Sequence, residues 1–359
     1  MEWSARFFYR VIFTSGAEHE HRQSRDRPWQ ALVSCCWKDA AGHISHRQKF
    51  NRAQLIEFVA RHSPCLIGME TCCGSQYLAR KFLALGHEVK LLPAQYVKPF
   101  VKSQKNDFND ALAIAEAVRM PTMRFVPIRS EEQMDVQALH RARERLVRQR
   151  LAMTNQIRGL LLDRGIEIAQ GFYALRTVLP KLLADDTDLL TPMMRDLLGI
   201  LLQAWNQTEQ AIADLNARVE QLARASETCR RLQSIPGVGP LLATAIVASV
   251  GNGTEFKRAR DLASWAGLVP KQLSTGGTTR LAGITKRGNS YLRRLLIQGA
   301  RAVWVWKDKH PNDPLQQWLI QLGERRHAHV AVTALANKIA RIAWAVLRSG
   351  NAFQVQHRP

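Results

Sequence analysis

The sequence predicts an α/β domain followed by two helical regions, and three observations indicate this fold class. Short apolar runs alternate with helix-length segments over residues 31–128, as in a sheet layered with helices. Helical periodicity continues over residues 129–228, and residues 229–350 are again mostly helical, with glycine-rich turns. We therefore expect three domains with these bounds, a poorly ordered leader over residues 1–30 and a tail over residues 351–359.

Local patterns predict the elements of the α/β region in turn. Two apolar runs flank a turn at Asp39 to Gly42, which indicates a β-hairpin. The expected elements are a strand over 31–37, a strand over 43–50, a helix over 52–61, a strand over 65–69, a helix over 75–85 and a strand over 88–92. Residues 1–30 are rich in Arg, His and Gln and show only a short apolar patch, so no regular element is expected there.

Two long helices are predicted in the middle of the chain. In the first, apolar residues recur every seven positions, at Leu139, Leu146, Met153 and Leu160. In the second they follow a three-four-three spacing, at Ile212, Leu215, Val219 and Leu222. Two arrangements fit these patterns: a coiled coil, formed between the two helices or with a second subunit, and a helical hairpin inside one subunit.

Two amphipathic helices are predicted near the C-terminus. The apolar positions expected to face inward are Leu292, Leu295, Leu296 and Val303 in the first, and Val332, Leu335, Ile339, Ile342 and Val346 in the second. The first helix carries Arg293, Arg294 and Arg301 on its other side, and Gly350 is the expected C-cap of the second.

The charge of the chain indicates a polyanionic partner. The 359 residues include 51 Lys and Arg against 30 Asp and Glu, a formal net charge of +21. This balance disfavours an enzyme of small metabolites and favours DNA or RNA, because basic surfaces gain affinity by releasing the counterions of phosphate backbones. With 46% apolar residues the chain is nevertheless expected to fold.

The cysteines and the apolar runs argue against several classes of protein. The six cysteines form no C-x-x-C motif, which fits neither a zinc site nor a disulfide framework. No run of eighteen apolar residues and no secretory signal is found, so a cytoplasmic protein without a membrane partner is expected.

Three acidic residues are candidates for chemistry. Glu70 directly follows a predicted buried strand, at the end where open α/β sheets bind their ligands. Asp107 and Asp110 stand at the start of a predicted helix, three residues apart and therefore on one face. Either Asp alone is explained as helix capping. The three together predict a Mg²⁺ site, because close carboxylates repel unless a cation lies between them.

Two glycine-rich segments are candidates for phosphate contact. Gly237 and Gly239 lie between two predicted helices and let backbone N–H groups approach a phosphate, as in helix-hairpin-helix modules. A tight interhelical turn is the alternative, and we favour phosphate contact because of the charge. Farther on, Ser274 and Thr275 precede paired glycines, and Lys286-Arg287 follows. By composition alone this segment is a phosphate-binding surface loop.

Taken together, these segments resemble insertion-sequence family one-ten, the DEDD-type transposases described as bridge-RNA-guided serine recombinases. The resemblance runs from about Val33 to Leu347 and is carried by residues 66–70 (LIGME), 105–111 (KNDFNDA), 138–146 (ALHRARERL), 235–240 (IPGVGP), 267–270 (GLVP) and 284–289 (ITKRGN).

The resemblance implies a RuvC-like, ribonuclease-H-fold domain, a coiled-coil linker and a small helical transposase domain. In this family four acids hold Mg²⁺, and a serine attacks DNA to form a phosphoserine link. By position, Glu70, Asp107 and Asp110 look like the second, third and fourth acids. Ser274 is the expected nucleophile, with Thr275 as the alternative. Lys286, Arg287, Arg293 and Arg294 are expected to contact nucleic acid. The implied partners are DNA, a structured guide RNA and further subunits in a dimer or tetramer, in a bacterial protein that is nucleoid-associated when on DNA.

The N-terminus departs from the family pattern. Family members begin with an apolar strand that carries the first acid, about twelve residues ahead of the acid matching Asp39. Here only Asp26 stands near that place, in a polar segment followed by Pro28. We therefore expect a leader foreign to the family, loss of the first acid and part of the central strand, and impaired catalysis.

Two other functions remain open on the sequence. A non-catalytic nucleic-acid-binding remnant needs no Mg²⁺ and binds with a steep salt dependence. A RuvC-like junction-resolving nuclease uses the acids alone, so loss of both hydroxyls at residues 274 and 275 leaves its cleavage intact.

Overall fold

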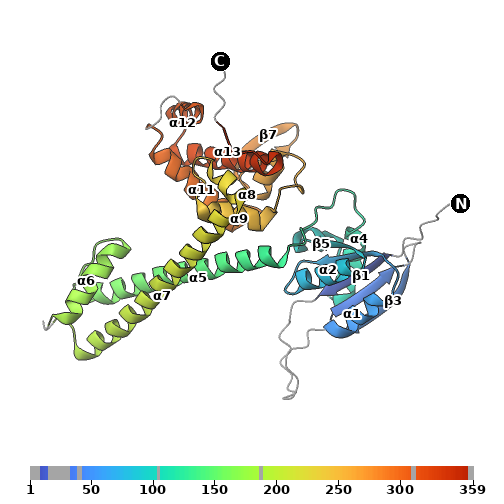
Figure 1. Cartoon of the computed structure of the whole chain (residues 1–359), viewed down its shortest axis with the longest axis horizontal. Helices are drawn as coiled ribbons and strands as arrows, with labels where there is room; N and C mark the ends of the chain where they lie inside the picture. The colour runs from blue at the N-terminus through green and yellow to red at the C-terminus, as the bar shows by residue number, and fades with distance from the viewer. Residues whose placement is uncertain are drawn as a thin grey trace. The chain divides into compact units, whose positions relative to one another are not determined.

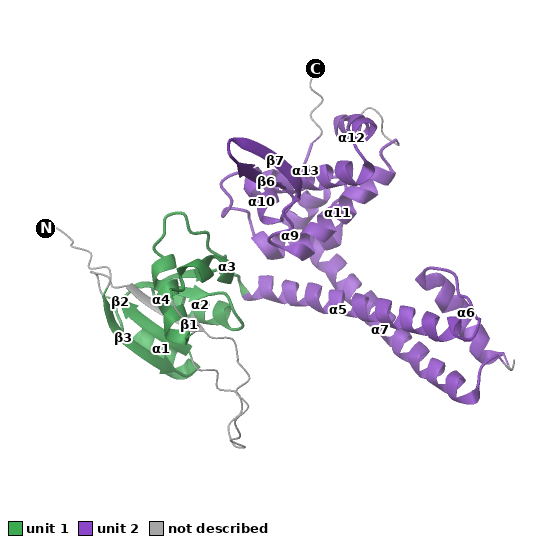
Figure 2. Ribbon diagram, turned by 180° about the vertical axis from the view of Figure 1, so that it is seen from behind, with its two compact units in different colours: residues 1–130 green, residues 131–359 purple. Residues whose placement is uncertain are grey.

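The computed structural model divides into two compact units, residues 1–130 and residues 131–359 (Figure 2). It describes residues 9–14, 33–38, 43–102, 106–185, 189–308 and 313–354, with residues 9–14 described by their backbone alone. The α/β region thus forms a unit of its own, and the two predicted helical regions are grouped together in the second unit.

Unit 1 is built on a five-stranded mixed sheet in the order β3-β2-β1-β4-β5 (Figure 1). The strands are β1 (Tyr9–Thr14), β2 (Val33–Lys38), β3 (Ile44–Phe50), β4 (Leu66–Glu70) and β5 (Glu88–Leu92). β2 pairs antiparallel with both β1 and β3, whereas β4 pairs parallel with both β1 and β5. The four strands from β2 onward agree with the predicted ranges to within two residues.

The prediction that residues 1–30 contain no regular element is wrong at β1. This strand lies at the centre of the sheet, between β2 and β4, so the central strand, which was expected to be missing in part, is present. The apolar patch that encodes it is too short to show a period by itself, and pairing with strands on both sides overrides the weak local signal. Asp26 and the other residues between 14 and 33 lie outside the described residues.

Helices cover both faces of the sheet. α1 (Arg52–Ala60) and α2 (Ser75–Ala84) pack on one face, and α4 (Asp107–Ala117) packs on the other. The short α3 (Ala94–Val97) and a 3-10 turn, η1 (Lys98–Phe100), precede α4. Adjacent residues of β2 serve opposite faces: Cys35 is buried with α1 and α2, and Cys36 with α4. Such a strand is covered on both faces, which explains its mostly apolar sequence.

Unit 2 begins with a long helical hairpin. Its helices are α5 (Glu131–Leu162), α6 (Phe172–Ala184) and α7 (Pro192–Ala225). α5 and α7 run antiparallel, because Arg143 bonds Asn216 whereas Trp205 donates to Thr154 farther along α5. The chain therefore shows the helical hairpin inside one subunit.

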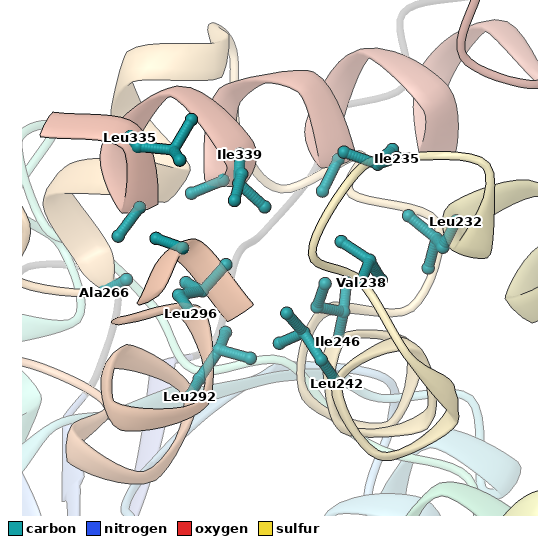
Figure 3. Packing of buried hydrophobic residues seen from close by; sticks show 14 of the residues in the cluster. Leu232, Ile235, Val238, Leu242, Ile246, Ala266, Leu292, Leu296, Leu335 and Ile339 are labelled. Carbon is teal, nitrogen blue, oxygen red and sulfur yellow. The ribbon is translucent and has the colours of Figure 1, made fainter. Parts of the chain in front are cut away.

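The rest of unit 2 is a helical core. It contains α8 (Glu227–Gln233), α9 (Pro240–Val250), α10 (Ala259–Trp265), α11 (Ser290–Val305), α12 (Pro314–Arg325) and α13 (Ala328–Ser349). Figure 3 shows Leu292 and Leu296 of α11 in one buried cluster with Leu335 and Ile339 of α13, which confirms that these four residues face inward. The predicted C-cap is also confirmed, since Gly350 has φ 70° and donates its N–H to the carbonyl of Val346.

α13 is long and apolar enough to cross a membrane by composition, the one such helix in the described part of the chain. It packs against α8, α10, α11 and α12 and buries one face among them. The composition of α13 is therefore accounted for by its place in the core.

A β-hairpin interrupts the helices of unit 2, where only helices and turns are predicted. β6 (Pro270–Thr275) pairs antiparallel with β7 (Thr278–Ile284). The turn is Gly276-Gly277, with φ values of 54° and 79°. Two positive φ values are typical of the type I′ turn, for which Gly-Gly is a preferred sequence. The hairpin signal is thus present in the sequence.

Candidate functional site

Three acidic side chains gather at one edge of the unit 1 sheet. Glu70 is the last residue of β4, and Asp107 and Asp110 lie in the first turn of α4, where the side chain of Asn106 caps the helix by accepting from the N–H of Phe108. α4 crosses the sheet closely because Gly68 has no Cβ. A Cβ there would lie 3.1 Å from Val118. The fold therefore brings the start of α4 toward the carboxyl end of β4.

Glu70 and Asp110 interact through their charges. The pKa of Glu70 is raised above its usual value, first by burial of the carboxyl and second by the negative charge of Asp110. Both causes disfavour the charged carboxylate. A cation placed between the two side chains would relieve both, so this pair fits a divalent ion such as Mg²⁺.

Asp107 is held differently from the other two acids. Its Oδ2 atom lies 3.1 Å from Nζ of Lys49 on β3 and accepts a hydrogen bond from the Ser34 hydroxyl at 3.4 Å. Both charged side chains are well exposed, with relative areas of 46% for Lys49 and 37% for Asp107. An ion pair this exposed contributes at most about 1 kcal/mol, so it is weak enough for a metal ion to replace.

The described residues do not form a ready three-ligand metal centre. Among them, no three His, Cys, Asp or Glu side chains are grouped as metal ligands. β1 adds no carboxylate, because its sequence is YRVIFT. Its residue Phe13 is the register partner of Ser34, which donates to Asp107. The observed candidate metal ligands are therefore the Glu70 and Asp110 pair. Asp107 is instead paired with Lys49.

The two candidate nucleophiles lie at the exposed end of the unit 2 hairpin. Ser274 pairs with Thr279 across the strands, and Thr275 pairs with Thr278 next to the turn. The Ser274 hydroxyl accepts from Nε2 of Gln272 at 2.9 Å and lies 3.3 Å from the Thr279 hydroxyl. Within the described part of the chain, no carboxylate or imidazole contacts either hydroxyl. Neither hydroxyl therefore has a general base in place.

The base of the hairpin is held tightly. Lys286 has φ 56°, which is rare for a residue with a side chain, and its N–H donates to the carbonyl of Gly267. Gly288 has φ 84°, and a Cβ there would lie 1.8 Å from the Trp265 carbonyl oxygen. The guanidinium of Arg293 donates to the carbonyls of Ala266 and Arg287. Of the predicted phosphate ligands, Lys286 and Arg287 are exposed. Arg293 instead links the segment before the hairpin, at Ala266, to the segment after it, at Arg287.

Arg294 also has protein partners. Its guanidinium forms an ion pair with Glu144 of α5 and lies 5.6 Å from the centre of the Tyr291 ring. Arg148, one turn farther along α5, forms an ion pair with the same carboxylate. Arg294 is thus fixed beside a basic surface of the long helix.

The turn before α9 has a structural role at one of its two glycines. Gly237 has φ 83°, and a Cβ there would lie 2.6 Å from the carbonyl oxygen of Gly299 in α11. Gly239 is the N-cap of α9, with open space around its Cα atom. The predicted tight turn accounts for Gly237, and Gly239 is the position left open for phosphate contact.

Several residues of these surfaces are absent from the predictions. Ser34 and Lys49 hold Asp107, but a lone Ser or Lys in a strand carries no distinguishing sequence signal. His140 is 3% exposed and bonds Tyr291 and Thr244, which ties α5 to α9 and α11. Burial, followed by the nearby charge of Arg143, lowers the pKa of His140 to about 4, so this histidine is neutral at pH 7.

Comparisons with known proteins define the class of this chain as a transposase. Residues 33–164 match a transposase family model of the DEDD type from the IS110 group, and residues 229–315 match the model described as Transposase IS116/IS110/IS902 family. The first match covers the acid-bearing unit from residue 33 together with α5, and the second covers the part of unit 2 that carries the hairpin.

Full-length relatives give the same answer. The chain is 44% identical over 310 residues to a probable family 20 transposase of Pseudomonas aeruginosa, a match that spans 86% of this chain and 91% of that protein. It is 44% identical over 316 residues to the transposase for insertion sequence element IS1111A of Coxiella burnetii, spanning 88% and 86%. It is 40% identical over 312 residues to the transposase for IS1328 of Yersinia enterocolitica, spanning 87% and 92%. The chain belongs to the IS110 family of transposases, which confirms the resemblance predicted from the sequence.

Proposed function

We propose that this transposase cuts and rejoins DNA with two separate sets of groups. Glu70, Asp107 and Asp110 hold Mg²⁺, and the hydroxyl of Ser274 or Thr275 attacks a DNA phosphodiester. The observation that carries the proposal is the placement of Glu70 near Asp110, because burial and the charge of Asp110 both raise the pKa of Glu70 and a bound cation would offset both. Family membership makes DNA the substrate.

The topology of unit 1 supports a RuvC-like, ribonuclease-H-type domain. Three antiparallel strands, β3-β2-β1, are continued by two parallel ones, β4 and β5, and the last helix packs on the face opposite α1 and α2. We assign the α5 and α7 hairpin to the coiled-coil linker that the resemblance implies, and the turn at Gly239 to the helix-hairpin-helix-like phosphate contact expected from its glycines.

The residues divide the chemistry between them. Bound Mg²⁺ supplies Lewis-acid stabilisation of charge on the phosphodiester. The hydroxyl gives its proton to water as its oxygen bonds to phosphorus, and the P–O bond to the leaving strand breaks, so that the leaving sugar oxygen takes up a proton. The chain keeps the DNA as a phosphoester until a sugar hydroxyl attacks the same phosphorus, which rejoins the DNA and releases the protein hydroxyl. Lys286 and Arg287, exposed at the base of the hairpin, bind the flanking phosphates.

The proposal includes the partners implied by the family resemblance. DNA and a structured guide RNA account for the charge of +21. Exchange between two duplexes requires a dimer or tetramer, and the protein acts in the bacterial cytoplasm on the nucleoid, with no membrane partner. In this copy, the missing acid of β1 weakens Mg²⁺ binding and slows the reaction.

Two observations favour a second candidate, a non-catalytic nucleic-acid-binding protein. β1 contributes no carboxylate, and Asp107 already has a cationic partner in Lys49. A protein with this site would keep the basic surfaces of unit 2 and bind DNA and RNA without metal.

A covalent-adduct assay tests the proposal. The full chain, with the RNA that copurifies with it, is incubated with the end sequences of its own element and Mg²⁺, and protein-linked DNA is detected on denaturing gels. We expect a weak adduct that disappears in the double variant Ser274→Ala/Thr275→Ala and in Glu70→Gln. Thr278→Ala, on the same hairpin, is the matched control and keeps it.

The other outcomes separate the alternatives. Cleavage without adduct in the double hydroxyl variant assigns a hydrolytic junction-resolving nuclease. Salt-sensitive binding with neither cleavage nor adduct, in the natural chain and all variants, assigns the non-catalytic protein.

A further inference from the structure

A pocket lined by arginine lies between α5 and α11 within unit 2. Its volume is about 480 Å³. The lining residues are Arg148 of α5 and Ser290, Arg293, Arg294, Ile297, Gln298 and Arg301 of α11. None of these lining residues is acidic. We call this set the arginine pocket.

The amphipathic character of α11 places these side chains outward. Pocket residues recur at positions 290, 293 and 294, 297 and 298, and 301, which form one face of a helix. The opposite face, with Leu292, Leu296, Ala300 and Val303, is buried in the core. Burial of the apolar face therefore fixes the basic face beside α5.

The charge of the pocket is only partly balanced. Glu144 forms ion pairs with both Arg148 and Arg294, while Arg293 bonds backbone carbonyls. Arg301 is exposed and makes no hydrogen bond or ion pair with the residues that the structure describes. Four arginines less one glutamate leave a formal charge of +3 here. Each guanidinium has five N–H donors, so most donors remain open for an anion.

We propose that the arginine pocket binds phosphodiester groups of a nucleic-acid backbone through Arg148, Arg294 and Arg301, with Glu144 as an internal counter-ion that limits the affinity. Guanidinium groups match phosphate oxygens in bidentate geometry. The site rests on the nucleic-acid-binding part of the proposed function and adds Arg148 and Arg301 to it. It needs neither metal nor a nucleophile.

Charge-matched variants of the full chain test the pocket. Binding of labelled single-stranded RNA and duplex DNA of one sequence is followed by fluorescence anisotropy in EDTA at rising KCl concentration. We expect Arg148→Ala and Arg301→Ala each to weaken binding about fivefold to tenfold at low salt and to reduce the slope of log K against log salt by about 0.7 to 0.9. Arg218→Ala, which removes an exposed α7 arginine outside the pocket, changes affinity less than about twofold.

The counter-ion gives a test of opposite sign. Glu144→Gln is expected to tighten binding, because it frees two guanidinium groups for phosphate. Glu220→Gln also removes one acid paired with an arginine, Arg224, but outside the pocket, and it leaves affinity nearly unchanged. A variant that loses side-chain packing would weaken binding in both cases, so a gain separates this site from a folding defect.

Each possible result either supports or overturns phosphate binding in the arginine pocket. Equal losses for Arg301→Ala and Arg218→Ala, or weaker binding for Glu144→Gln, overturn the pocket. Losses on both probes support a backbone site of either nucleic acid, whereas a loss on one probe alone assigns the site to RNA or to DNA. Because EDTA removes metal chemistry, the adduct assay can fail while this difference persists, and the reverse also holds.

Discussion

The candidate acids of unit 1 and the candidate hydroxyls of unit 2 are held in contrasting ways. Glu70 is partly buried at the end of a strand covered on both faces, and Asp107 has two side-chain partners. Ser274 and Thr275 lie on a hairpin whose residues are exposed along nearly its whole length. The acids are therefore ordered by the core of their own unit, whereas the hydroxyls are ordered only through the base of the hairpin.

This difference suggests where each half of the site gains its geometry. A carboxylate at a sheet edge is preorganised before any ligand binds, at the electrostatic cost seen in the raised pKa of Glu70. An exposed hydroxyl without a base has no fixed reactive geometry until substrate is bound. We infer that DNA binding completes the geometry around the hydroxyls, whereas the fold places the acids before DNA binds.

The largest predicted effect tests the base of the hairpin. Gly288→Ala is expected to lower the free energy of unfolding of unit 2 by about 3 kcal/mol, from the positive φ and from the clash with the Trp265 carbonyl. Urea denaturation followed by tryptophan fluorescence measures it. Gly276→Ala is the matched control, because its φ is 54° but its surroundings are open, and it should lose only about 1 kcal/mol. Equal losses would show that the base is not a tight support.

Much of unit 1 could be predicted because its strands are read locally. The run at Cys65 to Met69 and the alternation of strands with helices gave the order of elements and the place of Glu70. β1 could not be read in this way. Its short apolar patch shows no period, and its position depends on hydrogen bonds to two strands that follow it in the chain.

The acids of the candidate site could be named from the sequence, but the residues that contact them could not. Asp107 and Asp110 stand out because two acids open a helix next to a capping Asn106. Lys49 and the arginine pocket arise from contacts between segments far apart in the sequence, and such contacts leave no local pattern. The β6–β7 hairpin is absent from the predictions for another reason. By composition its paired glycines indicate a phosphate-binding loop, whereas their φ values are typical of a type I′ turn.

Restoring a carboxylate to β1 tests whether the acid site lacks a metal ligand from this strand. Phe13→Asp places an acid at the register partner of Ser34, which already donates to Asp107. We expect Mg²⁺ affinity to rise about tenfold, as one more hard oxygen ligand becomes available, and the DNA adduct to increase with it. Isothermal titration calorimetry measures the affinity.

The neighbouring position supplies the control for this variant. Ile12→Asp places the acid at the partner of Cys35, which is buried on the other face of the sheet. An unpaired charge introduced there should destabilise unit 1 without tighter Mg²⁺ binding. Equal Mg²⁺ affinity in Phe13→Asp and the natural chain would contradict the view that β1 lacks a ligand.

The smallest predicted effect is a pH dependence that reports the burial of the Glu70 carboxyl and, second, its repulsion by Asp110. The folded-state pKa of Glu70 lies above its unfolded value, so between the two the folded state binds more protons than the unfolded state. The contribution of Glu70 to stability is therefore full below the unfolded pKa, near 4.5, and is lost as the pH rises through the folded pKa. In EDTA, the free energy of unfolding of the natural chain relative to Glu70→Gln should accordingly fall as the pH rises.

Metal should reverse the sign of that dependence. Mg²⁺ bound to the Glu70 and Asp110 pair favours the charged carboxylates, which lowers the folded-state pKa and makes stability rise with pH relative to the variant. Urea midpoints of unit 1 measured at a series of pH values, with EDTA and then with Mg²⁺, give both slopes. Asp110→Asn serves as a second variant, since it removes the repulsion and leaves Glu70 in place. Identical slopes in all three proteins, with or without Mg²⁺, would mean that the two carboxylates do not act as one cation-binding pair, and the acid half of the site would then have no basis in this fold.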